Sequence, residues 1–132
     1  MVAWLEYKKA ARGRGALALE CYVVVSMPVQ GVDFVKQHLG QHLAYQAQQE
    51  ALGNLMFAGP LSDLSGEEME GAGMIIYQTK SMDLAKDIAD KDPMHLSGAR
   101  TYTLRRWLIN EGSMQLDLKL SAQSVKLGKE SG

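Results

Sequence analysis

The stretch LECYVVV at residues 19–25 decides the fold that this sequence predicts. Its side chains are β-branched, aromatic or apolar, and polar residues hardly alternate with them, which is typical of a central strand buried on both faces. Ser26-Met27-Pro28 follows and ends the run. We therefore expect residues 19–25 to lie in the middle of a β-sheet.

The sequence beyond this strand alternates between helical and extended patterns. From Asp33 to Leu52 apolar residues recur at every fourth position, which predicts a helix with Asp33 as its N-cap and Gly53 beyond its end. Ser81 is expected to cap a second helix, which the Asp92-Pro93 step breaks. Strands are expected at residues 55–58, 73–79 and 101–109, and a loop at residues 61–72. The order β-α-β-β-α-β predicts an α+β fold of the ferredoxin-like βαββαβ type.

A further strand is predicted after this domain. Within residues 113–122 apolar side chains alternate with polar ones, which is the period of a half-buried strand. A strand added to a complete sheet needs an edge or a partner chain with which to pair. We therefore expect residues 1–17 to be a loosely ordered N-terminal extension, residues 18–109 to be the domain, and residues 110–132 to form an extra C-terminal strand and tail in oligomer contacts.

The expected sheet also predicts a homodimer. Two helices cover only one face of a four-stranded sheet, so the opposite face stays bare. A large exposed apolar surface is uncommon on a monomer, and pairing two such faces removes it from water. We therefore expect the chain to form a homodimer or a larger homo-oligomer. A small molecule bound in a pocket is the other expected partner.

The composition excludes several classes of protein. The chain has 132 residues, of which 46% are hydrophobic and 22% charged, and its formal net charge is −1. This balance is ordinary for one globular domain and attracts neither nucleic acid nor anionic lipid. The lone cysteine, Cys21, suits a reducing compartment and a place in the core. No apolar run reaches the roughly 20 residues that span a bilayer, and Glu20 interrupts the run that a secretion signal would need. We expect a soluble, cytoplasmic protein with no nucleic-acid or membrane partner.

The histidines are the main candidates for chemistry, and the chain has three of them. His38 and His42 are four residues apart, so they project from the same side of the predicted helix. That spacing could hold a metal, but the glutamate of an HExxH motif is absent and no third ligand is marked. We expect no metal, and a partly solvated His38.

His42 lies at the border of the apolar stripe, where an imidazole can exchange a proton near neutral pH if a partner fixes its tautomer. Asp92 is the candidate partner, because it ends a helix where the chain turns back toward the sheet. Asp92 followed by Pro93 also fits a plain helix N-cap with proline at the first position. His95 could line a pocket or could be a polar turn residue. The residues alone leave these alternatives open.

A set of motifs in fixed order resembles the YciI-like family over residues 18–109. They are His42-Leu43-Ala44, Gly53, Ala58-Gly59-Pro60-Leu61, Gly71 and Gly73, Lys91-Asp92-Pro93-Met94-His95, Gly98 and Arg100. The resemblance implies a dimeric α+β barrel, related in fold to muconolactone isomerases and to small cofactor-free monooxygenases. It also implies that His42 and Asp92 form the pair that marks the active site. One branch of the family resembles a dehydrochlorinase acting on chlorinated hydroxyquinones.

The expected function is that of a small enzyme that needs no cofactor. His42 would take or give a proton and Asp92 would orient its ring, in an isomerisation or elimination on a small cyclic or aromatic-derived metabolite. The substrate would contact Gly59, Pro60 and Leu61 on one side of the pocket, with Met94 and His95 on the other. This hypothesis requires an imidazole nitrogen of His42 within about 3.2 Å of an Asp92 oxygen, beside an open cavity.

Two other functions fit the sequence. The same pocket could belong to a small-ligand-binding or regulatory module without turnover, in which His42 only forms a hydrogen bond or senses pH. The chain could instead be an accessory subunit whose extra strand docks on a partner. Pairing of residues 113–122 within the homodimer, as opposed to an open edge, would separate this last hypothesis from the others.

The C-terminal segment gives a first testable prediction. Deletion of residues 112–132 is expected to lower the molecular mass of the assembly measured by light scattering, because the apolar side of residues 113–122 would exchange between subunits or bridge dimers. An unchanged mass would contradict this role.

Overall fold

The computed structural model describes residues 1–128 and divides the chain into two compact units. One unit is continuous and spans Leu19–Leu108. The other combines Met1–Ala18 with the chain from Ile109 onward. No helix within residues 1–128 is both long enough and apolar enough to span a membrane.

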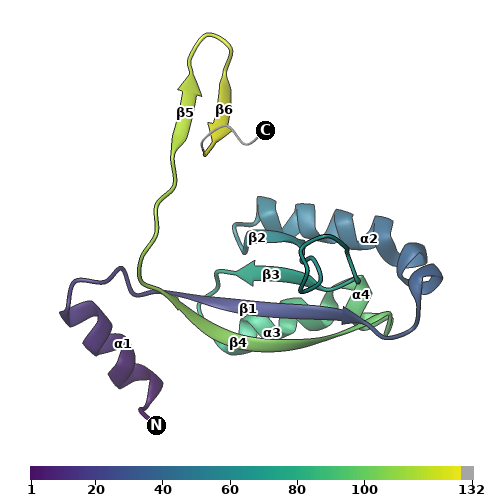
Figure 1. Cartoon of the computed structure of the whole chain (residues 1–132), viewed down its shortest axis with the longest axis horizontal. Coiled ribbons are helices and arrows are strands. Elements are labelled where there is room, and N and C mark those ends of the chain that lie inside the picture. Colours follow the sequence, from purple (N-terminus) through teal and green to yellow (C-terminus); the bar gives the residue numbers. More distant parts are fainter. Residues whose placement is uncertain (129–132) are drawn as a thin grey trace. The chain divides into compact units, whose positions relative to one another are not determined.

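The Leu19–Leu108 unit has the predicted ferredoxin-like α+β fold (Figure 1). Its elements are β1 (Leu19–Pro28), α2 (Val32–Ala51), β2 (Leu55–Pro60), β3 (Gly73–Tyr77), α3 (Met82–Lys91), the short α4 (Pro93–Leu96) and β4 (Arg100–Ile109). The strands form one sheet in the order β2-β3-β1-β4, with β1 antiparallel to β3 and β3 antiparallel to β2. The strand from which the prediction started therefore lies in the interior of the sheet.

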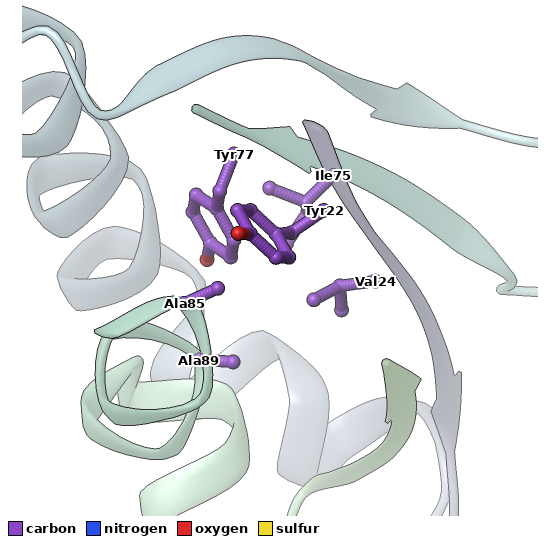
Figure 2. Packing of buried hydrophobic residues seen from close by; sticks show 6 residues of the cluster. All are labelled: Tyr22, Val24, Ile75, Tyr77, Ala85 and Ala89. Carbon is purple, nitrogen blue, oxygen red and sulfur yellow. The ribbon is translucent and has the colours of Figure 1, made fainter. Parts of the chain in front are cut away.

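The core lies between one face of this sheet and α3. Tyr22 of β1 is paired with Tyr77 of β3, and Val24 with Ile75, so these four side chains share a face. Figure 2 shows them directed toward two small residues of α3, Ala85 and Ala89, and all six belong to one buried cluster. Alanine at these helix positions lets the two tyrosine rings pack close to the helix backbone.

The opposite face of the sheet is less covered than the sequence predicted. Val23 and Val25 of β1, and Met74 of β3, alternate with the core residues and are only half-buried. The prediction that residues 19–25 are buried on both faces is therefore wrong for the chain alone, because α2, α3 and α4 all pack on the core side. On this side of β1 and β3, Cys21 and Ile76 are buried.

The ends of the two long helices test the capping predictions. Ser81 caps α3 as predicted, since its hydroxyl oxygen accepts a hydrogen bond from the Leu84 backbone N–H at 3.1 Å. The prediction for Asp33 is wrong: the N-cap of α2 is Gly31, and Asp33 lies in the first turn. Gly31 has φ 85°, a conformation that glycine adopts without steric cost, which sets the start of the helix two residues earlier than the aspartate suggested.

The second unit contains α1 (Trp4–Gly13) and a hairpin of β5 (Leu116–Lys119) and β6 (Ser124–Leu127). The helix lies in the segment that the sequence indicated as loosely ordered. The sequence WLEYKKAARG consists mostly of good helix formers, which accounts for a helix in this segment.

The C-terminal segment differs from the single long strand that its alternation suggested. Residues 116–119 pair with residues 124–127, and the chain reverses between them, with Gln123 at φ 51°. The turn falls inside the predicted strand because the alternation of a hairpin strand has the same period as that of a longer strand. Leu116 faces Leu127 across the hairpin and Leu118 faces Val125, and all four are about 60% exposed. A two-stranded hairpin of this kind is marginally stable by itself.

The tight fit of α3 on the tyrosines gives a prediction for stability. Ala85→Leu is expected to lower the free energy of unfolding by about 1–3 kcal/mol, because added methylenes in a packed core force side chains out of their preferred rotamers. Urea denaturation checks this. Lys86→Leu is the matched control, since it adds the same side chain to the exposed side of the same helix and should change the midpoint far less. Equal destabilisation by both variants would contradict the packing argument.

Candidate active site

A cavity of about 470 Å³ opens between α2 and the sheet. Helix α2 contributes one wall, the ends of β2 and β3 with the loop that joins them contribute the second, and β1, β4 and α4 complete it. The lining residues are Ser26, Val35, Leu39, His42, Leu43, Gln46, Ala58, Gly59, Pro60, Met69, Gly71, Ala72, Gly73, Met74, Ile75, Met94 and Arg100. The cavity is thus largely apolar, with a few polar groups, which is typical of a small-molecule site.

His42 and Asp92 form a hydrogen-bonded pair at this cavity. The Nδ1–H of His42 donates to both carboxylate oxygens of Asp92, at 2.8 and 2.9 Å, although the two residues are 50 positions apart. The Asp92 side chain is fully buried and the His42 side chain is 17% exposed. The distance meets the requirement set from the sequence. Nε2 of His42 has no hydrogen-bonding partner within residues 1–128, so it is the ring nitrogen left for a ligand.

Asp92 is also a helix N-cap, which is the alternative role that the sequence left open. It is the N-cap of α4, where its Oδ1 accepts a hydrogen bond from the Met94 backbone N–H at 2.9 Å, and Pro93 occupies the first helical position. Its extended backbone, with φ −58° and ψ 128°, is the conformation that a following proline favours. The two interpretations are therefore compatible, because capping α4 holds the carboxylate in the place where His42 meets it.

Tyr45 fixes α2 against α3 next to this pair. Its hydroxyl donates to the Ile88 carbonyl oxygen at 2.8 Å. Burial, followed by the negative charges of Asp92 and Asp87, raises the pKa of Tyr45 to about 12. The phenol therefore stays protonated near neutral pH and keeps the hydrogen bond that joins the two helices one turn from His42.

Arg100 lies at the start of β4 and lines the cavity, and neutral groups accept its hydrogen bonds. Its Nε–H donates to Ser26 Oγ at 2.8 Å, and its Nη2 donates to the Ser26 carbonyl oxygen at 2.8 Å and to the Gly71 carbonyl oxygen. Burial lowers the pKa of Arg100 from its ordinary value, which leaves the guanidinium charged at any physiological pH. The side chain thus places a fixed positive charge at the cavity.

His95 lies behind Ser26 and does not line the cavity. Its Nδ1–H donates to the Ala89 carbonyl oxygen at 2.7 Å, so its Nε2 accepts the hydroxyl hydrogen of Ser26 at 2.8 Å. Burial lowers the pKa of His95, which favours the neutral ring that this arrangement needs. His95, Ser26 and Arg100 therefore form a directed chain of hydrogen bonds that ends at the guanidinium.

The loop between β2 and β3 supplies Met69 and Gly71 to the cavity. Its first turn is held by Asp63, whose Oδ1 accepts hydrogen bonds from the Ser65 hydroxyl and from the backbone N–H groups of Ser65 and Gly66. These bonds, first of all that of the Ser65 hydroxyl, lower the pKa of Asp63. Gly71 has φ 103°, and a Cβ there would lie 2.8 Å from Pro28 Cγ, so only glycine fits where the loop rejoins the sheet.

The structure brings together most, but not all, of the residues that the sequence singled out. Gly59, Pro60 and Met94 line the cavity with His42, whereas Leu61 and His95 do not. Leu61 lies past the end of β2 and is 37% exposed. Sequence reasoning missed Ser26, which ended the first strand in the pattern, and it quoted Arg100 only as part of a motif. A cationic residue directly before a predicted strand was the signal that could have pointed to Arg100.

The other candidates for chemistry have structural roles. Cys21 is buried, its thiol donates to Met56 Sδ at 3.7 Å, and burial, then the charge of Glu20, raises its pKa, so it is a poor nucleophile. The His38 ring packs on Phe34 with 4.9 Å between centroids. Residues 1–128 contain no group of three His, Cys, Asp or Glu side chains that could hold a metal ion.

The fold and the site define a small ferredoxin-like α+β protein with a histidine–aspartate pair at an apolar cavity. The YCII-related domain matches residues 21–108, and the chain belongs to this family. The uncharacterized protein YjpA of Bacillus subtilis is 23% identical over 90 residues, which are 68% of this chain and 99% of that protein.

A solved structure shares the fold. It is the 5-chloro-2-hydroxyhydroquinone dehydrochlorinase TftG of Burkholderia phenoliruptrix, in complex with 2,5-dihydroxybenzoquinone. The TM-score is 0.54 and the sequence identity 19%, over 66% of this chain and 92% of that one. The resemblance to the YciI-like family that the sequence motifs indicated is thereby confirmed, as is the fold of the dimeric α+β barrel class.

The buried His95 gives a prediction for the pH dependence of stability. An unfolded histidine titrates near pH 6.5, and the folded-state pKa of His95 lies lower, so the unfolded chain takes up this proton first as the pH falls. As the pH is lowered from about 7 to the folded-state pKa of His95, the free energy of unfolding is therefore expected to decrease. The decrease should be less steep in His95→Gln. Urea denaturation of both proteins between pH 8 and 5 measures the slopes. Equal slopes would mean that the His95 pKa is not lowered in the folded state.

Proposed function

We propose that this protein is a small acid–base enzyme that catalyses an isomerisation or an elimination on a cyclic or aromatic-derived metabolite, without a cofactor. The observation that carries the proposal is the His42–Asp92 hydrogen bond at 2.8 Å beside the cavity. Imidazole is the side chain best suited to proton transfer near neutral pH, and a carboxylate on Nδ1 leaves Nε2 to face the substrate.

The proposed chemistry uses the two residues in different roles. Nε2 of His42 removes a proton from the bound substrate, and the electron pair of the broken bond moves into the substrate. In an isomerisation the imidazolium returns the proton to another atom of the substrate. In an elimination the leaving group departs with the electron pair of its bond to the substrate, and the imidazolium then gives the proton to water. Asp92 is the positioning residue, because it orients the ring and stabilises the imidazolium while its own bond to Met94 keeps it in place.

Two observations support the class of substrate. The cavity volume of about 470 Å³ is within the range of small-molecule sites, and its apolar walls fit a ring. The protein that shares the fold is named as a dehydrochlorinase of 5-chloro-2-hydroxyhydroquinone and binds 2,5-dihydroxybenzoquinone, which makes hydroxylated hydroquinones and quinones the first compounds to try. Fold likeness by itself does not transfer an activity, so the proposal depends on the pair and the cavity.

The proposal includes a homodimer in a reducing, cytoplasmic setting. Val23, Val25 and Met74 form a half-buried apolar strip on the face of the sheet that no helix of the Leu19–Leu108 unit covers. A second copy on this face would remove the strip from water. The exposed apolar side chains of the β5–β6 hairpin are proposed to add contacts between copies.

Activity measurements on dyad variants test the function. Turnover of a panel of hydroxyquinones, chlorinated hydroxyquinones and unsaturated lactones is followed by absorbance, with incorporation of solvent deuterium as the readout of proton transfer. His42→Gln is expected to lower kcat about 10²–10⁴-fold, the usual contribution of a general base. Asp92→Asn should also lower kcat, and it is a mild change because asparagine is an equally good N-cap for α4.

His38→Gln is the matched control, since it removes a histidine one turn earlier on the same helix and outside the cavity. It should keep full activity. Unchanged turnover in His42→Gln would overturn the mechanism. Binding of these compounds that weakens in His42→Gln and Asp92→Asn, without turnover or deuterium exchange in the wild type, would instead favour a ligand-binding module.

A further inference from the structure

We propose that the cavity is selective for anionic ligands and that Arg100 is the residue that binds their negative charge, either a carboxylate or an ionised ring hydroxyl. The proposal deepens the proposed function by naming the charge of the substrate, and it rests on that function only in taking the cavity as the binding site. It would hold equally for a ligand-binding module.

The first observation is that Arg100 is a half-buried cation without an ionic partner. Among residues 1–128, no carboxylate lies within 4.0 Å of its guanidinium nitrogens. Arg106, on the same strand, has such a partner in Glu20 at 3.2 Å. A partly desolvated charge is costly unless an opposite charge or several hydrogen bonds compensate it. An anionic ligand would supply the missing charge.

The second observation is the way in which the guanidinium is held. Ser26 Oγ, the Ser26 carbonyl and the Gly71 carbonyl occupy Nε and Nη2, and all three acceptors are neutral. They orient the planar group without cancelling its charge. Nη1 has no hydrogen-bonding partner in the described part of the chain, so its two N–H groups are available to a ligand. A carboxylate or an ionised hydroxyl is the acceptor that such donors bind most strongly.

The third observation is the charge of the cavity itself. Its lining contains one guanidinium, one imidazole, one serine and one glutamine among otherwise apolar residues and glycines, and no aspartate, glutamate or lysine. Burial lowers the pKa of Arg100, and the negative charge of Asp92 opposes this effect. Asp92 is itself fully buried and is bonded to His42 and to the Met94 N–H. An anion in the cavity therefore meets one fixed positive charge and no exposed negative one. A ligand anchored at Arg100 would present the rest of its ring to Nε2 of His42.

The test compares benzoate with benzamide, two probes of nearly the same shape that differ in charge. Both are titrated into the full-length protein, and the dissociation constants are obtained from NMR shifts of the His42 ring and the Arg100 Nε–H signals. Benzoate is expected to bind about 3- to 30-fold more tightly than benzamide, because a hydrogen bond to a charged group contributes more binding free energy than one between neutral groups.

Variants assign the difference to Arg100. Arg100→Gln should remove the preference for benzoate, because it weakens benzoate binding more than benzamide binding. Arg105→Gln is the matched control: it removes the same charge from β4, but at an exposed residue outside the cavity lining, and it should keep the preference. If Arg100→Gln does not fold, the wild-type preference together with the shift of the Arg100 Nε–H signal on benzoate binding decides the question.

Three results would overturn the proposal: equal affinities for the two probes, an unchanged preference in Arg100→Gln, or no benzoate binding to the wild type at 100 mM. The outcome is separable from that of the proposed function. His42→Gln should still prefer benzoate even where it abolishes turnover. The probe titrations therefore test the anion site, and the turnover measurements test the proposed function.

Discussion

The buried carboxylate of Asp92 is the constraint on which the rest of this domain depends. A fully desolvated negative charge is tolerated only where several donors surround it, and here these are the Met94 backbone N–H and the His42 imidazole. The first donor ties the carboxylate to the start of α4, directly after α3, and the second ties it to the middle of α2. One side chain therefore links α2 to the junction of α3 and α4, and the cavity lies beside this link.

The sequence was sufficient for the βαββαβ order, which depends on local signals: β-branched runs, fourfold apolar spacing, and an Asp-Pro step at a helix end. The residues alone left the pairing of His42 with Asp92 open, because it is a contact across 50 positions, and only the resemblance to the YciI-like family indicated it. Other features that depend on long-range contacts could not be predicted. The position of His95 behind Ser26 follows from a hydrogen bond across 69 residues, and that of Arg100 from one across 74. Two local predictions were wrong for another reason. The N-cap of α2 is Gly31 and not Asp33, and a glycine at positive φ leaves no mark on the apolar period. The hairpin turn after β5 likewise leaves the alternation in residues 113–122 unchanged.

The cavity separates two tasks that are often combined in one group. On one side, a neutral chain from the Ala89 carbonyl through His95 and Ser26 orients Arg100 and ends in a permanent charge. On the other side, a buried carboxylate orients an imidazole that can change its charge. Ala89 and Asp92 lie three residues apart at the end of α3, so the same helix end positions both chains of hydrogen bonds. Ligand recognition by Arg100 and proton transfer by His42 thus use different side chains that are positioned by the same helix end.

The loop between β2 and β3 has a consequence for how this scaffold could diversify. Its turn is stabilised internally by Asp63, and it returns to the sheet at Gly71, the position that the backbone conformation reserves for glycine. Between these points most residues are exposed, and Met69 is the side chain that reaches the cavity. Insertions or exchanges within residues 67–70, after the Asp63 turn, would therefore reshape the cavity wall at Met69 while the proton-transfer pair and the arginine stay where they are. The loop is the natural segment to randomise in a directed-evolution library that aims to change ligand size.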